Sequence, residues 1–214
     1  FRRVAKAELR EDFTLLTPQE LSQSNKFYDF TPRLMYNKSR RRKATKEDEY
    51  YDGKLNHLWV DIFILDNLPN AKISQKLVLS LQKFIYLLSM GHRYKLDYKK
   101  YSLFQKICVF IISNIGKLIP MESLYKLQNN LSKSFNKKNV KRVYYSNYQP
   151  DYIDISLDKS CVEKNTYIQF EDSKLLIPEA YDEILRTVYG DYMKLPPKSQ
   201  RVATHGSLDI EVYR

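Results

Sequence analysis

The sequence has few glycines, cysteines and histidines. Its 214 residues include 5 Gly, 2 Cys and 3 His, and 5 glycines leave little room for a glycine-rich nucleotide loop. Cys108 and Cys161 show no short metal-binding spacing, so we interpret both as reduced and Cys108, in an apolar run, as a core residue. No apolar run reaches the roughly 20 residues that a membrane span needs. The sequence therefore does not indicate a zinc protein or a transmembrane protein.

The composition is that of a packed, basic domain. Hydrophobic residues make up 43% of the chain, with 18 Tyr and 10 Phe, which favours a folded protein over a disordered one. Lys and Arg exceed Asp and Glu by 36 − 25 = 11. This charge favours an anionic partner, which could be a nucleotide, a nucleic acid or an anionic membrane. The basic runs KSRRRK and KKNVKR lie among tyrosines but match no nucleic-acid motif, so we expect no nucleic-acid partner.

The N-terminal part predicts a helix at residues 2–11 and an extended segment at residues 13–16. Residues 38–52 are almost wholly polar and begin with a cationic run. This run is either a solvated loop or a binding element, and Lys38 and Arg40 are its candidate substrate-binding residues.

Residues 58–66, LWVDIFILD, predict a buried strand because β-branched and aromatic residues dominate. Asp61 in its middle would be costly to bury unless paired or bound to a cation. A structural ion pair and a metal-binding or catalytic role both stay open. Asp66 has the opposite parity and is expected to cap the following loop.

Residues 73–137 predict helices carrying apolar clusters and cations. A helical hairpin that packs on the core and one that lies on an anionic membrane are equally compatible with this pattern. The cations concerned are Lys83, Arg93, Lys95, Lys99, Lys100, Lys106 and Lys117. Beyond them the sequence predicts extended segments, a hairpin turning at residues 171–173 and a helix between Pro178 and Gly190. His57 and His92 are interpreted as surface or interface histidines.

Two distant segments resemble one known family. WVDIFILDNLP, and FEDSKLLIPEAYDEILRTVYGDYMKLPPKSQRVATH near the C-terminus, are similar to the hallmarks of the LicD phosphotransferases, relatives of the fukutins. The combination is more specific than either half. Ile64 departs from the usual Pro of this family and Gly206 from a frequent second His.

The resemblance implies an α+β fold with a nucleotidyltransferase-like mixed sheet, flanking helices and a mostly helical insertion. Residues 1–72 and 138–214 would form the core and the acceptor cleft, and residues 73–137 the insertion. Asp61 matches the third carboxylate of that fold and is expected to act as base or metal ligand for Mg²⁺ or Mn²⁺. Since the chain starts with Phe1, a further carboxylate pair is expected upstream of it.

The resemblance also implies an activity. A LicD-like enzyme would move phosphocholine, or a similar phospho-alcohol, from a CDP-activated donor to a sugar hydroxyl of a cell-surface glycan such as teichoic acid or lipopolysaccharide. Asp191, Arg201 and His205 join Lys38 and Arg40 as candidate substrate-binding residues. The expected location is cytoplasmic, with peripheral contact at the inner membrane face. A basic nucleic-acid-binding module and a catalytically inactive interaction protein of the same fold are the alternatives.

Overall fold

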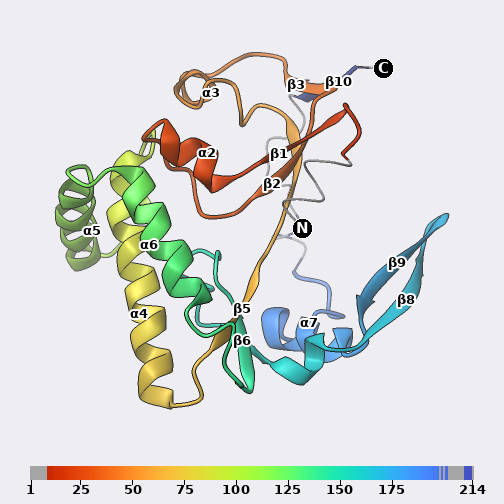
Figure 1. Cartoon of the computed structure of the whole chain (residues 1–214). Helices are drawn as coiled ribbons and strands as arrows, with labels where there is room; N and C mark the ends of the chain where they lie inside the picture. The colour runs from red at the N-terminus through yellow and green to blue at the C-terminus, as the bar shows by residue number, and fades with distance from the viewer. Residues whose placement is uncertain (1–8, 198, 200, 202–209, 214) are drawn as a thin grey trace.

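The computed structural model describes residues 9–197, 199, 201 and 210–213. It confirms the predicted α+β class, because helices and small sheets alternate along the chain (Figure 1). Every strand pair in these residues is antiparallel, and the strands form four small sheets where one mixed sheet was expected. The predicted helix at residues 2–11 falls mostly outside the described residues, and residues 9–11 are not helical.

The first sheet contains β1 (Phe13–Leu16), β2 (Arg33–Tyr36) and β4 (Leu58–Asp61), in the order β1-β2-β4. The short helix α2 (Pro18–Gln23) follows β1. A core of buried side chains holds these elements together. Its members are Leu16, Leu21, Met35, Tyr51 and Leu55.

The polar segment 38–52 is more ordered than a solvated loop. It contains β3 (Ser39–Arg41), which pairs with β10 (Ile210–Val212), and the helix α3 (Lys46–Tyr50). Thr45 and Asp48 form a capping box in which each side chain accepts a hydrogen bond from the other's backbone N–H. The polar residues therefore serve a helix start.

The strand predicted at residues 58–66 is divided between two sheets. β4 ends at Asp61, and β5 (Leu65–Leu68) begins a second sheet with β6 (Arg142–Tyr145) and β7 (Ser156–Asp158), in the order β5-β6-β7. Leu68 and Tyr144 are fully buried between this sheet and α4. The prediction of one continuous strand is wrong, although the whole run is extended.

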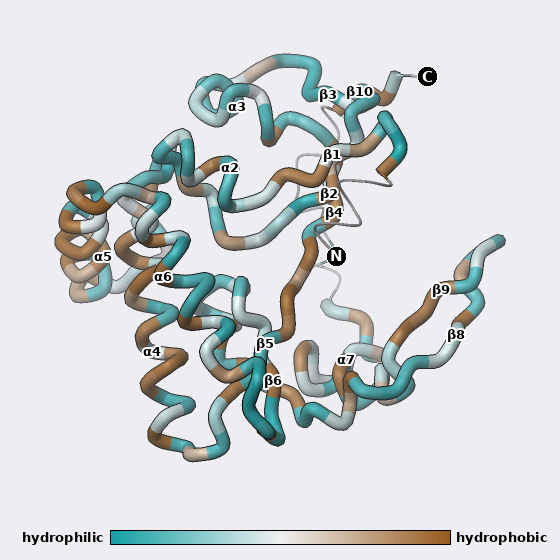
Figure 2. Tube along the Cα trace, viewed as in Figure 1, coloured by the Kyte–Doolittle hydropathy of each residue, from teal (hydrophilic) through white to brown (hydrophobic). Residues whose placement is uncertain are grey.

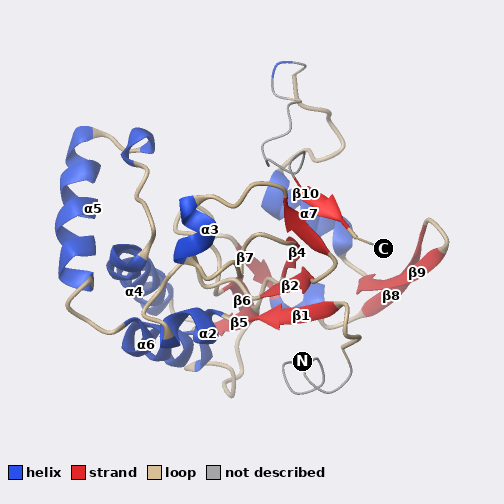
Figure 3. Cartoon of the chain, turned by 90° about the horizontal axis from the view of Figure 1, so that it is seen from above, coloured by secondary structure: helices blue, strands red, loops and turns tan. Residues whose placement is uncertain are grey.

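Three helices occupy the segment for which helices were predicted. They are α4 (Lys72–Ser89), α5 (Leu103–Gly116) and α6 (Met121–Lys133). The short 3-10 helices η1 (Met90–His92) and η2 (Tyr98–Lys100) connect α4 to α5. α4 and α6 bury a core with Phe27 and Phe30, whereas α5 lies at the outer edge of the molecule in both views (Figures 1 and 3).

A separate hairpin and helix precede the C-terminal segment. After η3 (Lys159–Val162), β8 (Asn165–Phe170) and β9 (Ser173–Pro178) form the predicted hairpin, which projects from the body (Figure 3). Its turn at Glu171 has a φ of 51°. α7 (Tyr181–Tyr189) begins three residues later than predicted because Pro178 still pairs with Asn165.

Candidate functional site

Asp61 lies at the end of β4, directly opposite Arg33 of β2. The Arg33 Nε atom is 3.1 Å from Asp61 Oδ1, so the ion pair that the sequence left open is present. The Asp61 side chain is 39% exposed. The expectation of a buried carboxylate is wrong here, because β4 ends at Asp61 and leaves one side of the residue open to solvent.

Arg33 is itself a buried, fixed cation. Its side chain is 4% exposed, and its two terminal nitrogens donate to the two oxygens of Asp29 at 2.9 and 2.6 Å. The guanidinium also lies 4.8 Å from the ring centre of Tyr28 and 5.5 Å from that of Trp59. Burial opposes the charge of Arg33, but the Asp29 carboxylate outweighs it and raises the pKa of the guanidinium. Asp61 therefore faces a cation that cannot move away.

The link between β4 and β5 is held by one asparagine from a distant part of the chain. Asn147 accepts from the Ile64 N–H at 2.7 Å and donates to the Ile62 carbonyl at 2.9 Å. The Ile62 N–H donates to the Pro32 carbonyl at 2.9 Å. These bonds satisfy the backbone where the strand changes sheets, and they fix Asp61 and Phe63 on either side of Ile62.

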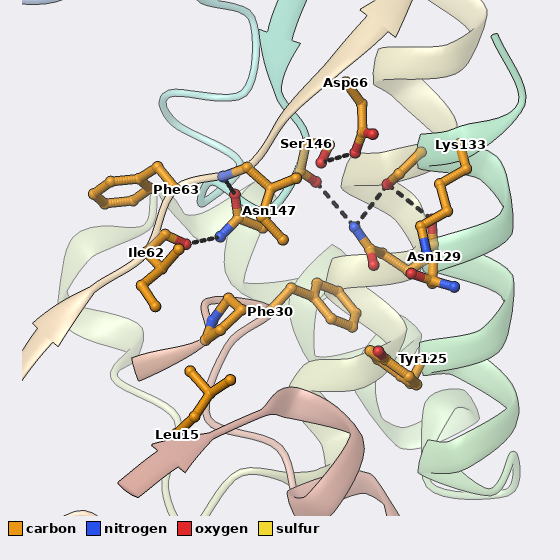
Figure 4. A pocket seen from close by; sticks show the side chains of 14 residues that line it. Leu15, Phe30, Ile62, Phe63, Asp66, Tyr125, Asn129, Lys133, Ser146 and Asn147 are labelled. Atoms are coloured by element: carbon orange, nitrogen blue, oxygen red, sulfur yellow. Dashed lines mark hydrogen bonds between the residues drawn. The ribbon is translucent and has the colours of Figure 1, made fainter. Parts of the chain in front are cut away.

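A cavity of about 470 Å³ lies behind this link (Figure 4). Asp66 is buried in its wall and accepts hydrogen bonds from the Ser146 hydroxyl and the Asn136 amide, both at 2.5 Å. The sequence predicted that Asp66 would cap the following loop. This prediction is wrong, because its carboxylate bonds to Ser146 and Asn136 instead. The cavity is lined by Leu15, Phe30, Pro32, Ile62, Phe63, Ile64, Asp66, Tyr125, Gln128, Asn129, Ser132, Lys133, Ser146 and Asn147.

Four aromatic rings gather beside Asp61. Phe63 lies 4.6 Å from Tyr148 and 6.1 Å from Tyr145, and Tyr148 lies 5.0 Å from Tyr152, measured between ring centres. Phe63 and Tyr152 are exposed. Burial raises the pKa of Tyr148, and the nearby Tyr189 and Asp61 raise it further. We call Phe63, Tyr145, Tyr148 and Tyr152 the aromatic cluster, and Asp61 acts electrostatically on its member Tyr148.

The cluster also joins the two segments that carry the LicD resemblance. Phe63 belongs to the first segment, and Tyr189, at the end of α7, belongs to the second. Tyr189 contributes to the raised pKa of both Tyr145 and Tyr148. Phe63 packs on these rings, and Tyr189, more than 100 residues further along the chain, acts on them electrostatically.

The other predicted site residues lie elsewhere or are less constrained. Lys38 and Arg40 follow the end of β2 that is remote from Arg33, and Lys38 pairs with Asp12 at 2.9 Å. Asp191 is exposed in the turn after α7. Arg201 is exposed and donates to the Pro196 carbonyl at 2.7 Å. His205 lies outside the described residues.

The described residues do not form a metal site by themselves. They contain no group of three His, Cys, Asp or Glu side chains that could hold an ion. Asp61 offers one carboxylate, while both oxygens of Asp29 are engaged by Arg33. A magnesium ion prefers an octahedral oxygen shell, so these residues do not complete a site by themselves.

Sequence reasoning missed Arg33, Asn147 and Tyr148. Arg33 sits among the apolar residues of FTPRLMY, where a cation needs a buried partner just as Asp61 does in its strand. That signal was available. The role of Asn147 carried no signal, since it depends on a contact across 83 residues.

Fold and site together define an α+β protein with a solvent-accessible carboxylate, fixed by a buried arginine, next to an aromatic cluster. Over 168 residues the chain is 30% identical to the lipopolysaccharide cholinephosphotransferase LicD of Haemophilus influenzae, a match that covers 72% of this chain and 57% of that protein. No family model matches the chain, and no solved structure matches it significantly. The sequence similarity confirms the predicted resemblance, and the chain belongs to the LicD family. It spans a little over half the length of this relative.

Proposed function

We propose that the protein is a LicD-type phosphotransferase that moves phosphocholine from a CDP-activated donor to a sugar hydroxyl of a cell-surface glycan. The observation that carries the proposal is the 168-residue similarity to a cholinephosphotransferase. The structure supports it in that Asp61, from the first hallmark segment, and Tyr189, from the second, both raise the pKa of Tyr148. The relative's name specifies lipopolysaccharide, and teichoic acid is a second glycan class with suitable hydroxyls.

Asp61 is the residue best placed to serve the reaction. Its carboxylate is 39% exposed, and the Arg33 Nε atom lies 3.1 Å from its Oδ1, so a buried cation fixes the position of one carboxylate oxygen. A positioned carboxylate can accept the proton of an acceptor hydroxyl as that hydroxyl attacks phosphorus. Arg33 is a positioning residue, since it is too buried to reach a substrate phosphate.

The aromatic cluster supports choline as the transferred alcohol. A quaternary ammonium group binds against aromatic faces with a contribution of roughly 0.5–2 kcal/mol. Phe63 and Tyr152 present exposed rings, and the Asp61 charge is nearby. A primary ammonium, as in ethanolamine, loses more hydration on such a surface. The arrangement therefore favours phosphocholine over phosphoethanolamine.

The ring proposal has its own test. Tyr148→Ala should raise KM for CDP-choline about threefold to thirtyfold. The matched control is Tyr167→Ala, which removes an exposed ring from β8, away from the cluster. Equal KM values in both variants would show that the rings of the cluster do not bind the donor.

Mg²⁺ dependence and the remaining substrate contacts are parts of the proposal that rest on the family. Lys38, Arg40, Asp191, Arg201 and His205 remain predicted substrate-binding residues. Bound Mg²⁺ would offset charge that develops on the transferred phosphate.

Transfer from CDP-choline to a glycan acceptor, followed by mass spectrometry of the product, tests the activity in the full-length protein. We expect Asp61→Asn to reduce kcat at least 100-fold, the lower range for a lost general base. The matched control is Asp154→Asn, which also removes an exposed carboxylate paired with a cation, Lys83 at 2.5 Å. Normal turnover of Asp61→Asn, or an equal loss of turnover in the control, would show that Asp61 has no specific role in the reaction.

A further inference from the structure

α5 turns its large apolar side chains away from the protein. Along and just after the helix, seven large apolar residues are each at least half exposed. Only Val109, Ser113 and Gly116 of the helix are buried. Figure 2 shows the resulting hydrophobic helix at the edge of the molecule. The exposed residues, which we call the α5 face, are Leu103, Phe104, Ile107, Phe110, Ile111, Ile115 and Leu118.

The reason lies in how α5 is attached. A Cβ added at Gly116 would lie 1.9 Å from the Leu88 carbonyl oxygen, and one at Gly91 would lie 2.1 Å from the Ser113 carbonyl oxygen. The buried His92 contacts the Gly116 and Ile119 carbonyls through Nε2 at 3.1 and 3.0 Å, so of the two predicted locations, surface or interface, it is not at the surface but between packed segments. Small residues let the backbones touch, and the bulky residues of α5 are left on the outside.

The charges within residues 98–121, which include α5, all have one sign, with Asp97 and Glu122 directly outside this range. Residues 98–121 contain four lysines, at positions 99, 100, 106 and 117, and no Asp or Glu. Two other cations of the segment serve the protein itself. Lys83 pairs with Asp154, and Arg93 donates to the Tyr86 hydroxyl at 2.6 Å and lies over the Phe27 ring. The other cations of this segment, Lys95 and the lysines of residues 98–121, are left for an external partner.

The length of α5 bears on the kind of contact. Of the helices that the structure describes, none by itself has the length and apolar character of a membrane span, and one pair, α5 with α6, reaches them only together across a bend of 108°. α6 buries Met121, Leu124 and Tyr125 in the core. α5 is thus the part of this pair that is available at the surface.

We propose that the α5 face is a docking surface for an anionic membrane. The helix would lie in the plane of the lipid headgroups, with its apolar residues inserted and the lysines against acidic lipid headgroups. The charge of the surrounding residues favours a membrane over a second copy of the protein as the partner of the α5 face. A twofold contact between two copies of this face would bring the lysines of both chains together with no carboxylate in residues 98–121 to offset them. A surface of acidic lipids supplies that opposite charge.

The apolar part of the proposal is tested by co-sedimentation of the full-length protein with vesicles rich in phosphatidylglycerol. Phe104→Ser with Ile107→Ser should weaken vesicle binding tenfold or more, because both side chains are more than half exposed and would insert. The matched control is Phe170→Ser with Leu176→Ser, which removes two equally exposed apolar residues from the projecting hairpin. The control should bind like the unmodified protein.

The charge part is tested with Lys106→Glu and Lys117→Glu. Each should weaken binding about fivefold or more, and high salt should do the same. Vesicles of phosphatidylcholine alone should bind much more weakly. Far-ultraviolet circular dichroism and thermal unfolding verify that each variant is folded.

Several outcomes would overturn the proposal. These are no vesicle binding at low salt, equal loss in the hairpin control, or indifference to lipid charge. Analytical ultracentrifugation provides a further one. If the protein does not bind vesicles and the α5 double variant converts a dimer into a monomer, the α5 face is an interface between copies.

Discussion

Asp29 and Asp61 both face Arg33, and the structure predicts opposite consequences of neutralising them. Asp29 is 5% exposed and binds the arginine through two hydrogen bonds of 2.9 and 2.6 Å. Asp61 is 39% exposed, and its Oδ1 lies 3.1 Å from the Arg33 Nε atom. Asp29→Asn therefore leaves a buried cation without its main partner, while Asp61→Asn changes an accessible contact.

The magnitudes differ accordingly. Removing one member of a buried ion pair costs about 3–5 kcal/mol of unfolding free energy. For a chain of this size that loss corresponds to a fall in Tm of roughly 10 °C. A partly exposed pair contributes about 0–1 kcal/mol, so Asp61→Asn should unfold close to the unmodified protein. Activity should show the reverse order, with Asp61→Asn inactive while still folded.

Urea unfolding followed by tryptophan fluorescence is a suitable assay, because the sequence has 1 Trp and this Trp59 lies 5.5 Å from the Arg33 guanidinium. Circular dichroism provides the global signal. A second variant separates charge from packing. Arg33→Met with Asp29→Leu removes the pair together and should recover much of the stability. Equal stability of the two Asn variants would refute the assignment of Asp29 as the structural partner and Asp61 as the functional one.

The remaining predictions concern packing, pH and metal. Gly116→Ala should lower the unfolding free energy by about 3 kcal/mol in urea unfolding, since its Cβ would meet the Leu88 backbone at 1.9 Å; an unchanged midpoint would contradict this packing. Burial raises the pKa of Tyr51 to about 12 from 10.0. The unfolded state therefore ionises first, so the stability that Tyr51 contributes is complete below pH 10 and should fall by about 2 kcal/mol on the way to pH 12; Tyr51→Phe should lose less stability than the unmodified protein over this range by about that amount. Chelation should abolish transfer and added Mg²⁺ should restore it; activity that survives chelation would exclude the metal requirement.

The sequence predicted the extended run at residues 58–66 but not its division. Apolar and β-branched residues favour extended backbone in either sheet. The local pattern therefore does not show at which residue the chain passes from the first sheet to the second. That point is set by Asn147, which bonds the backbone on both sides of Phe63. The same limit explains the error on Asp61. Whether a strand residue is buried depends on where its neighbour strands end, which is a tertiary property.

The helical segment shows a different limit. Its helices could be predicted because apolar periodicity and caps are local, as in the Ser102 and Gln105 capping box at the start of α5. Apolar character did not reveal which helix is core. α4 and α6 each bury one apolar side in the core, although α4 also exposes Ile73 and Leu77, whereas the large apolar residues of α5 are mostly exposed. The orientation of α5 follows from the close approach of its backbone to Gly91 and Leu88, and these partners lie outside the sequence of the helix.

The exchange of strands between sheets explains why the candidate site lies where it does. A strand that stayed in one sheet would bury alternate side chains and satisfy its backbone through ladder bonds. Here the ladder stops at Asp61, resumes at Leu65, and is replaced between them by bonds to Pro32 and Asn147. The gap leaves Asp61 and Phe63 exposed on a backbone that is nevertheless fixed at both ends. An accessible carboxylate and an accessible ring held this rigidly suit a site that must position a charged substrate. The irregularity that defeated the strand prediction is thus the feature that makes the site accessible.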